Sequence, residues 1–215
     1  EFPHLKGNGS IVLVHKTNDS YDSDGVNYAV EWDTSLKAQR WTCYQMHKGY
    51  TGKAGYYGTF TEDPDLPSYA RFANTNAMYT GSGFTRGHIC PSADRQYSLT
   101  ANIQTFYYTN MQPQYYNFNA GKNYTGVWVK MENRVRAWTG QLGTNDTMYV
   151  CKGGTIDVKD NILMYIKSQL IVPKYFFMAL LIKNSTGYKA LGFWAEHNND
   201  ILRSVNLKDY VVSIA

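Results

Sequence analysis

A histidine, an arginine and a glycine stand side by side near the middle of this 215-residue chain, in the order Arg86, Gly87, His88. A neutral imidazole can accept a proton from water near pH 7, and a guanidinium can bind a phosphate through two parallel hydrogen bonds. These residue types suit the hydrolysis of a phosphodiester bond. So short a motif is weak evidence for an enzymatic activity by itself. The segments that follow it in the sequence provide the stronger evidence.

Three further runs follow Thr85 and its neighbours in a fixed order. Residues 105–114 read TFYYTNMQPQ, residues 118–121 read FNAG, and residues 127–132 read VWVKME. Together the runs resemble the DNA/RNA non-specific endonucleases of the ββα-metal (His-Me finger) superfamily, with the pattern D-R-G-H, T-N-x-x-P-Q and F-N-x-G-x-W-x-x-L-E. The complete set is far more specific than any one run.

The resemblance implies a role for each matched residue. His88 is the expected general base, and Asn119 is the expected metal ligand through its amide oxygen. Glu132 is expected to hydrogen-bond metal-bound water, while Arg86 and Arg136 bind phosphate or support the site. The implied cofactor is Mg²⁺, with Mn²⁺ or another divalent cation as a substitute, and the implied partners are DNA and RNA, bound through the phosphate backbone.

Supporting roles follow for residues near these positions. Asn110 and Gln114 belong to the second run, and we expect them beside the site. Between residues 81 and 140 the acidic residues are Asp94 and Glu132 alone, too few for a carboxylate cluster that holds two metals. Magnesium prefers oxygen ligands and keeps several waters, so one lightly held ion is expected.

The chain departs from the family pattern at three places. Thr85 stands where aspartate is usual, so His88 needs another partner, such as a backbone carbonyl. Gly58 stands where many relatives have an arginine, and we expect Lys53 or Arg71 to replace it. Residues 122–125 lengthen the interval between Asn119 and the helix that follows.

Each candidate also has a purely structural interpretation. An asparagine near a glycine is a common turn former, which would explain Asn119 without a metal. Glu132 and Arg136 are four apart in a helical pattern, where they could form an ion pair. Cys90 lies two residues from His88, which makes a cysteine hydrolase a third hypothesis.

The composition bounds the class of protein. The chain is 43% hydrophobic and 18% charged, and it contains no apolar run long enough for a membrane span. We expect one soluble domain over residues 1–215. The net charge of +4 is compatible with a polyanionic partner, and 19 tyrosines could pack a core or stack on bases. A non-catalytic module that binds nucleic acids or glycans is therefore the alternative function.

Hydrophobic patterns indicate an α+β fold with a mostly antiparallel central sheet, flanking helices and, from the resemblance, a ββα-metal finger. Expected strands are residues 11–15, 28–32, 40–47, 147–151, 175–182 and 189–196. Residues 126–138 predict a helix, residues 48–76 a long loop, and residues 102–109 fit either a helix or a strand. The three cysteines match no zinc framework and leave one disulfide open. We also expect export, with the signal segment absent from this sequence.

Overall fold

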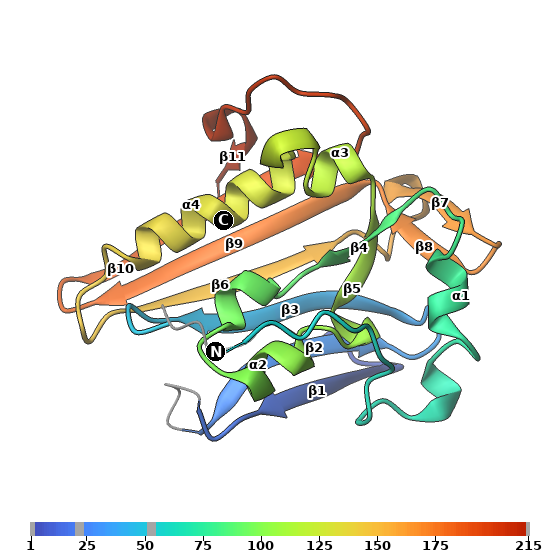
Figure 1. Ribbon diagram of the computed structural model, residues 1–215, viewed down its shortest axis with the longest axis horizontal. Coiled ribbons are helices and arrows are strands. Elements are labelled where there is room, and N and C mark those ends of the chain that lie inside the picture. Colours follow the sequence, from blue (N-terminus) through green and yellow to red (C-terminus); the bar gives the residue numbers. More distant parts are fainter. Residues whose placement is uncertain (1–2, 20–23, 51–54, 214–215) are drawn as a thin grey trace.

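A seven-stranded antiparallel sheet forms the centre of the computed structural model, which describes residues 3–19, 24–50 and 55–213 (Figure 1). Its strands, in spatial order, are β1 (Ser10–Lys16), β2 (Val26–Asp33), β3 (Ala38–Met46), β6 (Thr147–Gly154), β9 (Tyr175–Asn184), β10 (Gly187–Glu196) and β11 (Val211–Val212). Each neighbouring pair is antiparallel. The expected α+β fold with an antiparallel central sheet is confirmed.

Two small hairpins flank this sheet. The first joins β4 (Thr85–His88) to β5 (Met111–Gln114), and the second joins β7 (Ile162–Ile166) to β8 (Leu170–Pro173). The helices are α1 (Thr75–Tyr79), α2 (Leu99–Gln104), α3 (Tyr116–Asn119) and α4 (Val127–Thr139). Short 3₁₀ turns cover Ser68–Ala70, Ser92–Arg95, Tyr108–Asn110, Lys122–Tyr124, Lys159–Asn161 and Leu207–Tyr210.

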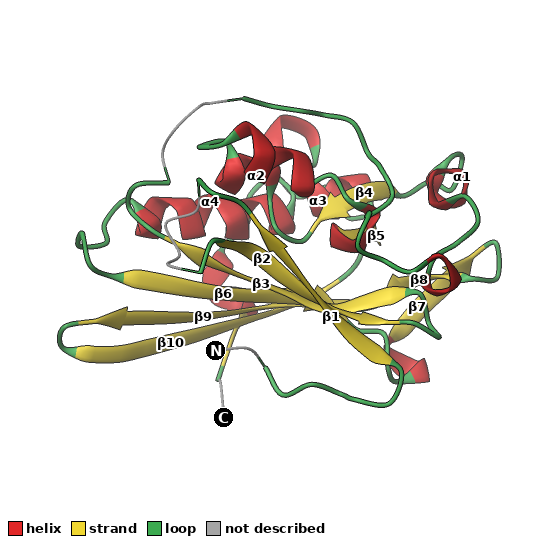
Figure 2. Ribbon diagram, turned by 90° about the horizontal axis from the view of Figure 1, so that it is seen from below, coloured by secondary structure: helices red, strands yellow, loops and turns green. Residues whose placement is uncertain are grey.

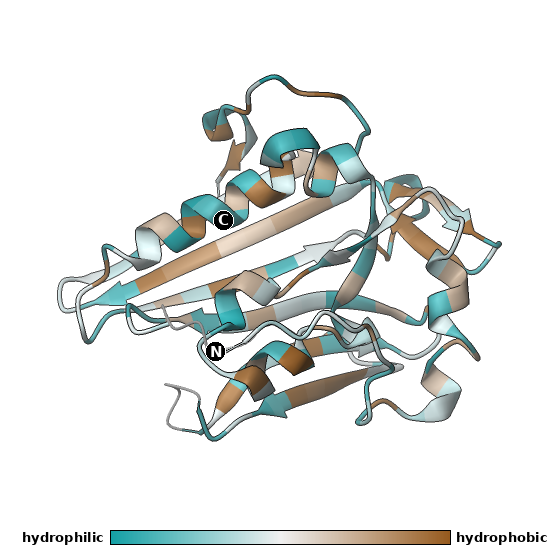
Figure 3. Cartoon of the chain, viewed as in Figure 1, coloured by the Kyte–Doolittle hydropathy of each residue, from teal (hydrophilic) through white to brown (hydrophobic). Residues whose placement is uncertain are grey.

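The helices α2, α3 and α4 lie on one face of the large sheet, and the β4–β5 hairpin lies on that face with them (Figure 2). The buried face of α4 contributes Val127, Trp128, Met131 and Val135 to the main core. Their spacing follows the helical repeat, which turns them all toward the sheet. Figure 3 shows the same pattern, with apolar and polar residues alternating along α4. The order β4, β5, α3 and α4 thus gives the expected ββα unit.

The expected strands all coincide with observed ones, and the expected helix at residues 126–138 corresponds to α4. The undecided segment 102–109 contains the end of α2 and the start of a 3₁₀ turn. The expected long loop contains Ser68–Ala70 and the start of α1, and its residues 51–54 lie outside the described part. Among the described residues, no helix is long and apolar enough to cross a membrane.

The cysteines are free thiols in this structure. Cys43 on β3 and Cys151 on β6 are directly opposite each other in the strand register, while Cys90 is fully buried in the core. If the chain carries a disulfide, the register leaves Cys43 and Cys151 as the pair.

Candidate active site

The β4–β5 hairpin places Arg86 and His88 on one face of a short strand, because side chains alternate along β-structure. Gly87 points the other way, against Gln114 of β5. A Cβ atom at Gly87 would lie 2.2 Å from Gln114 Oε1 and 2.7 Å from its Cγ. The glycine therefore lets the buried Gln114 side chain lie across the strand.

His88 is held by its main chain and by aromatic packing. Its carbonyl oxygen accepts a 2.9 Å hydrogen bond from Trp128 Nε1, and its ring lies 4.9 Å from the Phe106 ring in an edge contact. Among the described residues no group hydrogen-bonds its buried Nε2. The backbone carbonyl expected to orient the ring is not found in this part of the chain. Aromatic contacts replace it.

The electrostatic environment keeps His88 neutral. Burial, with the positive charge of Lys152, lowers the pKa of His88 from 6.5 to about 3. The imidazole is therefore neutral over the whole physiological pH range, as a general base must be before it accepts a proton. A pKa this far below the working pH makes it a weak base in this state.

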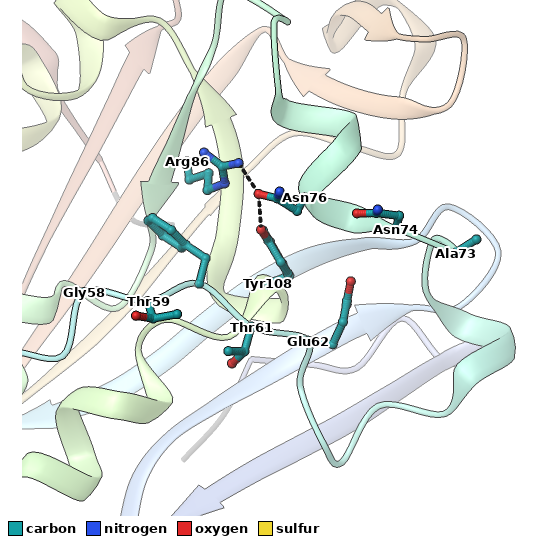
Figure 4. Close-up of a pocket in the computed structure, with 10 residues that line it drawn as sticks. Gly58, Thr59, Thr61, Glu62, Ala73, Asn74, Asn76, Arg86 and Tyr108 are labelled. Atoms are coloured by element: carbon teal, nitrogen blue, oxygen red, sulfur yellow. Dashed lines mark hydrogen bonds between the residues drawn. The ribbon is translucent and has the colours of Figure 1, made fainter.

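Arg86 lines a cavity of about 600 Å³, and Phe60, which also lines it, contacts the His88 ring with the ring centroids 5.7 Å apart. Its Nη2 donates a 2.5 Å hydrogen bond to Asn76 Oδ1, which also accepts one from the Tyr108 hydroxyl at 2.9 Å (Figure 4). The guanidinium lies 5.1 Å from the Phe60 ring and 5.3 Å from the Tyr79 ring. These contacts hold a planar cation in the cavity, where a phosphate oxygen could bind it.

Gly58 lines the same cavity, at the place where an arginine was sought in the sequence. Its φ of +84° lies in the left-handed region, which favours glycine over any side chain. Arg86 brings a guanidinium to this cavity from β4 instead. Of the suggested substitutes, Lys53 lies outside the described residues, and Arg71 directly follows the turn Ser68–Ala70.

Asn119 ends α3 and is tied to β4 by one hydrogen bond. Its Nδ2 donates to Thr85 Oγ1 at 3.0 Å, and that hydroxyl donates in turn to the Gln114 carbonyl at 2.8 Å. No described residue donates a hydrogen bond to the amide oxygen of Asn119. A free amide oxygen of fixed orientation is the type of ligand that Mg²⁺ accepts, so the residues present fit a lightly held divalent cation.

The extra residues 122–125 form a closed turn between α3 and α4. The Gly126 amide donates to the Ala120 carbonyl at 2.8 Å, so the end of the insertion lies directly beside the end of α3. A Cβ atom at Gly126 would lie 2.6 Å from the Phe118 carbonyl oxygen. The insertion is thus absorbed locally, and the close approach requires glycine.

Glu132 of α4 is paired with a lysine from the sheet. Its Oε1 accepts a 3.0 Å hydrogen bond from Lys152 Nζ. Arg136 instead bonds Asp94 Oδ1 at 2.6 Å, so the Glu132–Arg136 ion pair considered from the sequence is wrong. Burial raises the pKa of Glu132, and the positive charges of Lys152 and Arg136 oppose this effect.

Lys152 was not found by sequence reasoning, although the sequence carries a signal. Met148 and Val150 are buried on β6, and Lys152 follows them at the same two-residue spacing. A lysine at an inward-facing strand position needs a buried partner, because an unpaired buried charge is costly. That partner is Glu132.

Known proteins with similar sequences point to the same kind of enzyme. A family model described as DNA/RNA non-specific endonuclease matches residues 11–215. The chain belongs to this family. A nuclease of Nostoc sp. is 30% identical over 185 residues, which are 85% of this chain and 62% of the relative. Nuclease C1 of Cunninghamella echinulata is 32% identical over 199 residues, 87% of this chain and 75% of the relative.

Mitochondrial endonuclease G of Bos taurus is 28% identical over 198 residues, 87% of this chain and 63% of the relative. The chain thus spans less than two thirds of the Nostoc and bovine relatives. A solved chain from the EndoG/EndoGI complex shares the fold, with a TM-score of 0.74 and 18% identity. The alignment covers 96% of this chain and 82% of that one.

Asn110, a residue of this family's second run, is bonded to the backbone of the segment that follows His88. It is fully buried, and its Nδ2 donates to the carbonyls of Cys90 and Thr105 at 2.8 and 2.9 Å. Its Oδ1 accepts from the Cys90 amide at 2.7 Å. Asn110 therefore braces the segment after His88, and its supporting role stays a prediction. Gln114 supports the site by packing over Gly87 and by accepting the hydrogen bond of the Thr85 hydroxyl at its carbonyl.

Cys90 does not have the environment of a nucleophile. The residue is completely buried, and burial raises the pKa of its thiol to about 12. A cysteine nucleophile reacts as the thiolate, so this environment opposes the cysteine-hydrolase hypothesis.

A separate group of His15, Asp63 and Asp65 offers ligand atoms within 4.8 Å of one another, which could hold a metal ion. His15 Nε2 lies 3.1 Å from Asp63 Oδ2, and the Asp65 amide donates to Asp63 Oδ1 at 2.9 Å. The Thr109 hydroxyl also bonds Asp63. These contacts already satisfy the buried carboxylate, and we interpret the group as a set of polar contacts that anchors β1.

Proposed function

We propose that this protein is a divalent-metal-dependent endonuclease that hydrolyses the phosphodiester backbone of DNA and RNA. The observation that carries the proposal is the unpaired, neutral Nε2 of His88 on a strand whose Thr85 also holds Asn119. Membership of the family supports the same activity.

In the proposed mechanism, His88 takes a proton from water, and the oxygen attacks phosphorus opposite the 3′ oxygen. The bond to the 3′ oxygen breaks, the 3′ oxygen takes up a proton from water, and the phosphate stays on the 5′ oxygen of the downstream fragment. Arg86 binds the phosphate in the cavity beside His88, with Asn76 fixing its guanidinium. Arg136 fixes Asp94 next to Glu132 and so acts as a supporting residue.

Asn119 would bind the metal through its amide oxygen, and Glu132 would accept hydrogen bonds from the water around it. A bound Mg²⁺ or Mn²⁺ supplies positive charge for the phosphoryl and 3′ oxygens as they become more negative. The orientation of Asn119 comes from Thr85, and the ionised state of Glu132 is favoured by Lys152.

The mechanism uses no 2′-hydroxyl group, so DNA and RNA are both expected substrates with weak sequence preference. The net charge of +4 favours the approach of a polyanion. We further propose that residues 1–215 act as one domain and that the protein is exported. Cell fractionation with an antibody would test export, and nuclease found only in the cytosolic fraction would refute it.

One assay tests the proposed reaction. Purified protein is incubated with supercoiled plasmid and with RNA, in Mg²⁺ and in EDTA, beside His88→Ala and the control His4→Ala, which changes an exposed histidine. We expect cutting by the wild type and the control in Mg²⁺ only. Activity in EDTA or in His88→Ala would refute the mechanism. Binding without cutting would favour the non-catalytic module.

The product ends supply a second test. Fragments with a 5′ phosphate accept label from polynucleotide kinase only after phosphatase treatment. Direct labelling of untreated fragments would contradict the proposed direction of bond cleavage.

A further inference from the structure

Lys152 is a charged residue in a position that belongs to the apolar core. It lies on β6, opposite Thr42 of β3 and Met178 of β9, so it is enclosed by strands on both sides. Its side chain is completely buried. A buried ammonium group is costly unless it is paired and hydrogen-bonded. Its contacts therefore indicate what the charge is for.

Those contacts join two parts of the candidate site. Lys152 Nζ donates to Glu132 Oε1 at 3.0 Å and lies 4.4 Å from the centroid of the Trp128 ring. Trp128 donates from its indole nitrogen to the His88 carbonyl at 2.9 Å. The lysine thus contacts the carboxylate directly and the strand that carries His88 through one aromatic ring.

No other described cation donates a hydrogen bond to Glu132. Arg136 lies one helical turn away, but its Nη1 bonds Asp94 at 2.6 Å and its Nη2 bonds Asn133 at 2.8 Å. The guanidinium therefore acts on Glu132 only through space. The rotamer of Glu132 depends on Lys152.

We propose that Lys152 is the positioning residue for Glu132, holding that carboxylate ionised and in one orientation for the water around a bound cation. This inference rests on the proposed function of Glu132. Lys152 acts through Glu132, because its buried ammonium lies between that carboxylate and the Trp128 ring. Methionine would fill a similar volume without the charge, so the substitution Lys152→Met removes the interaction and keeps the packing.

A double-variant cycle tests the inference on nuclease activity. We compare kcat and KM of the wild type, Lys152→Met, Glu132→Gln and the double variant, at a temperature where all are folded. Lys183→Met on the exposed face of β9 is the matched control, because the same change is made outside the site. Circular dichroism and thermal unfolding monitor folding.

We expect Lys152→Met to lower kcat about 10–100-fold, to leave the KM for nucleic acid nearly unchanged, and to raise the Mg²⁺ concentration for half-maximal rate. In the Glu132→Gln background, the same change should alter kcat by less than about twofold, because the residue through which Lys152 acts is already lost. If Lys152→Met alone fails to fold, Lys152→Gln takes its place in the same cycle, since glutamine also removes the charge and can still form a hydrogen bond in the buried site.

Two results would overturn the inference. One is unchanged activity of Lys152→Met, and the other is an equal loss in both backgrounds, which would show that Lys152 acts independently of Glu132. Failure of the proposed function has a different signature. In that case Glu132→Gln and His88→Ala would themselves retain wild-type activity.

Discussion

The Thr85 hydroxyl accepts a 3.0 Å hydrogen bond from the amide nitrogen of Asn119 and so orients the amide oxygen of that residue. The family pattern has an aspartate at the position of Thr85. In this chain the threonine bonds the side chain on one side and the Gln114 carbonyl on the other. The substitution therefore connects β4, β5 and the end of α3 without adding a negative charge.

Replacing Thr85 by valine should weaken metal use. Valine keeps the shape but loses the hydroxyl that holds Asn119, so the amide can rotate. We expect the Mg²⁺ concentration for half-maximal rate to rise about tenfold, as for other residues that orient a metal ligand. The measurement is the nuclease rate against Mg²⁺ concentration, with Thr186→Val in the exposed β9–β10 turn as control. An unchanged Mg²⁺ curve would contradict this role of Thr85.

The low pKa of His88 should make folding stability depend on pH. Its pKa is lowered from 6.5 to about 3 in the folded chain, so between these values the unfolded chain binds the extra proton. Above pH 6.5 His88 is neutral in both the folded and the unfolded chain, so it does not affect the free energy of unfolding. As the pH falls from 6.5 toward 3, it lowers the free energy of unfolding progressively. Against His88→Gln, the wild type should lose up to about 1.4 kcal/mol more per pH unit in this window.

Urea unfolding at a series of pH values measures this difference. His197, whose pKa is lowered to about 4, remains in both proteins and cancels in the comparison. A His197→Gln variant should likewise lose less stability than the wild type as the pH falls from 6.5 toward 4, because the pKa of His197 is also lowered in the folded chain. Parallel stability curves for the wild type and His88→Gln would show that His88 titrates normally.

Removing Arg86 should weaken substrate binding more than the chemical step. Arg86→Ala deletes the cation held between Phe60 and Tyr79, and a hydrogen bond to a charged group is worth about 1.5–3 kcal/mol. We expect KM to rise at least about tenfold. The slope of log binding constant against log salt concentration should become smaller by about 1, the value for one lost phosphate contact. Titrations at several salt concentrations measure both, and Lys208→Ala is the control. An unchanged salt slope would exclude a phosphate contact.

Gly87 is required by the packing of Gln114. The missing Cβ would lie 2.2 Å from Gln114 Oε1 inside a fully buried region, so Gly87→Ala should destabilise the fold by about 1–3 kcal/mol. Shortening the neighbour in Gly87→Ala/Gln114→Ala should recover part of that loss. Chemical denaturation of the single and double variants decides this. Equal stability of Gly87→Ala and the wild type would disprove the predicted clash.

Local patterns in the sequence were enough to identify α4 and six of the seven strands of the large sheet, β11 being the exception. The helical spacing of Val127, Met131 and Val135 is a property of neighbouring residues, and it predicts the buried face directly. The motif order likewise brought together His88, Asn119 and Glu132 as one candidate site. The roles of these three residues remain predictions until variants are measured.

Only the tertiary structure showed which charged residues form ion pairs with each other. Glu132 pairs with Lys152 from another element, and Arg136 pairs with Asp94, although the helical repeat suggested that Glu132 and Arg136 would pair with each other. Asn110 likewise turned out to be a buried brace. Helical spacing states which side chains share a face of α4. The partners beneath that face depend on the strand order and register of the sheet, which join residues far apart in the sequence.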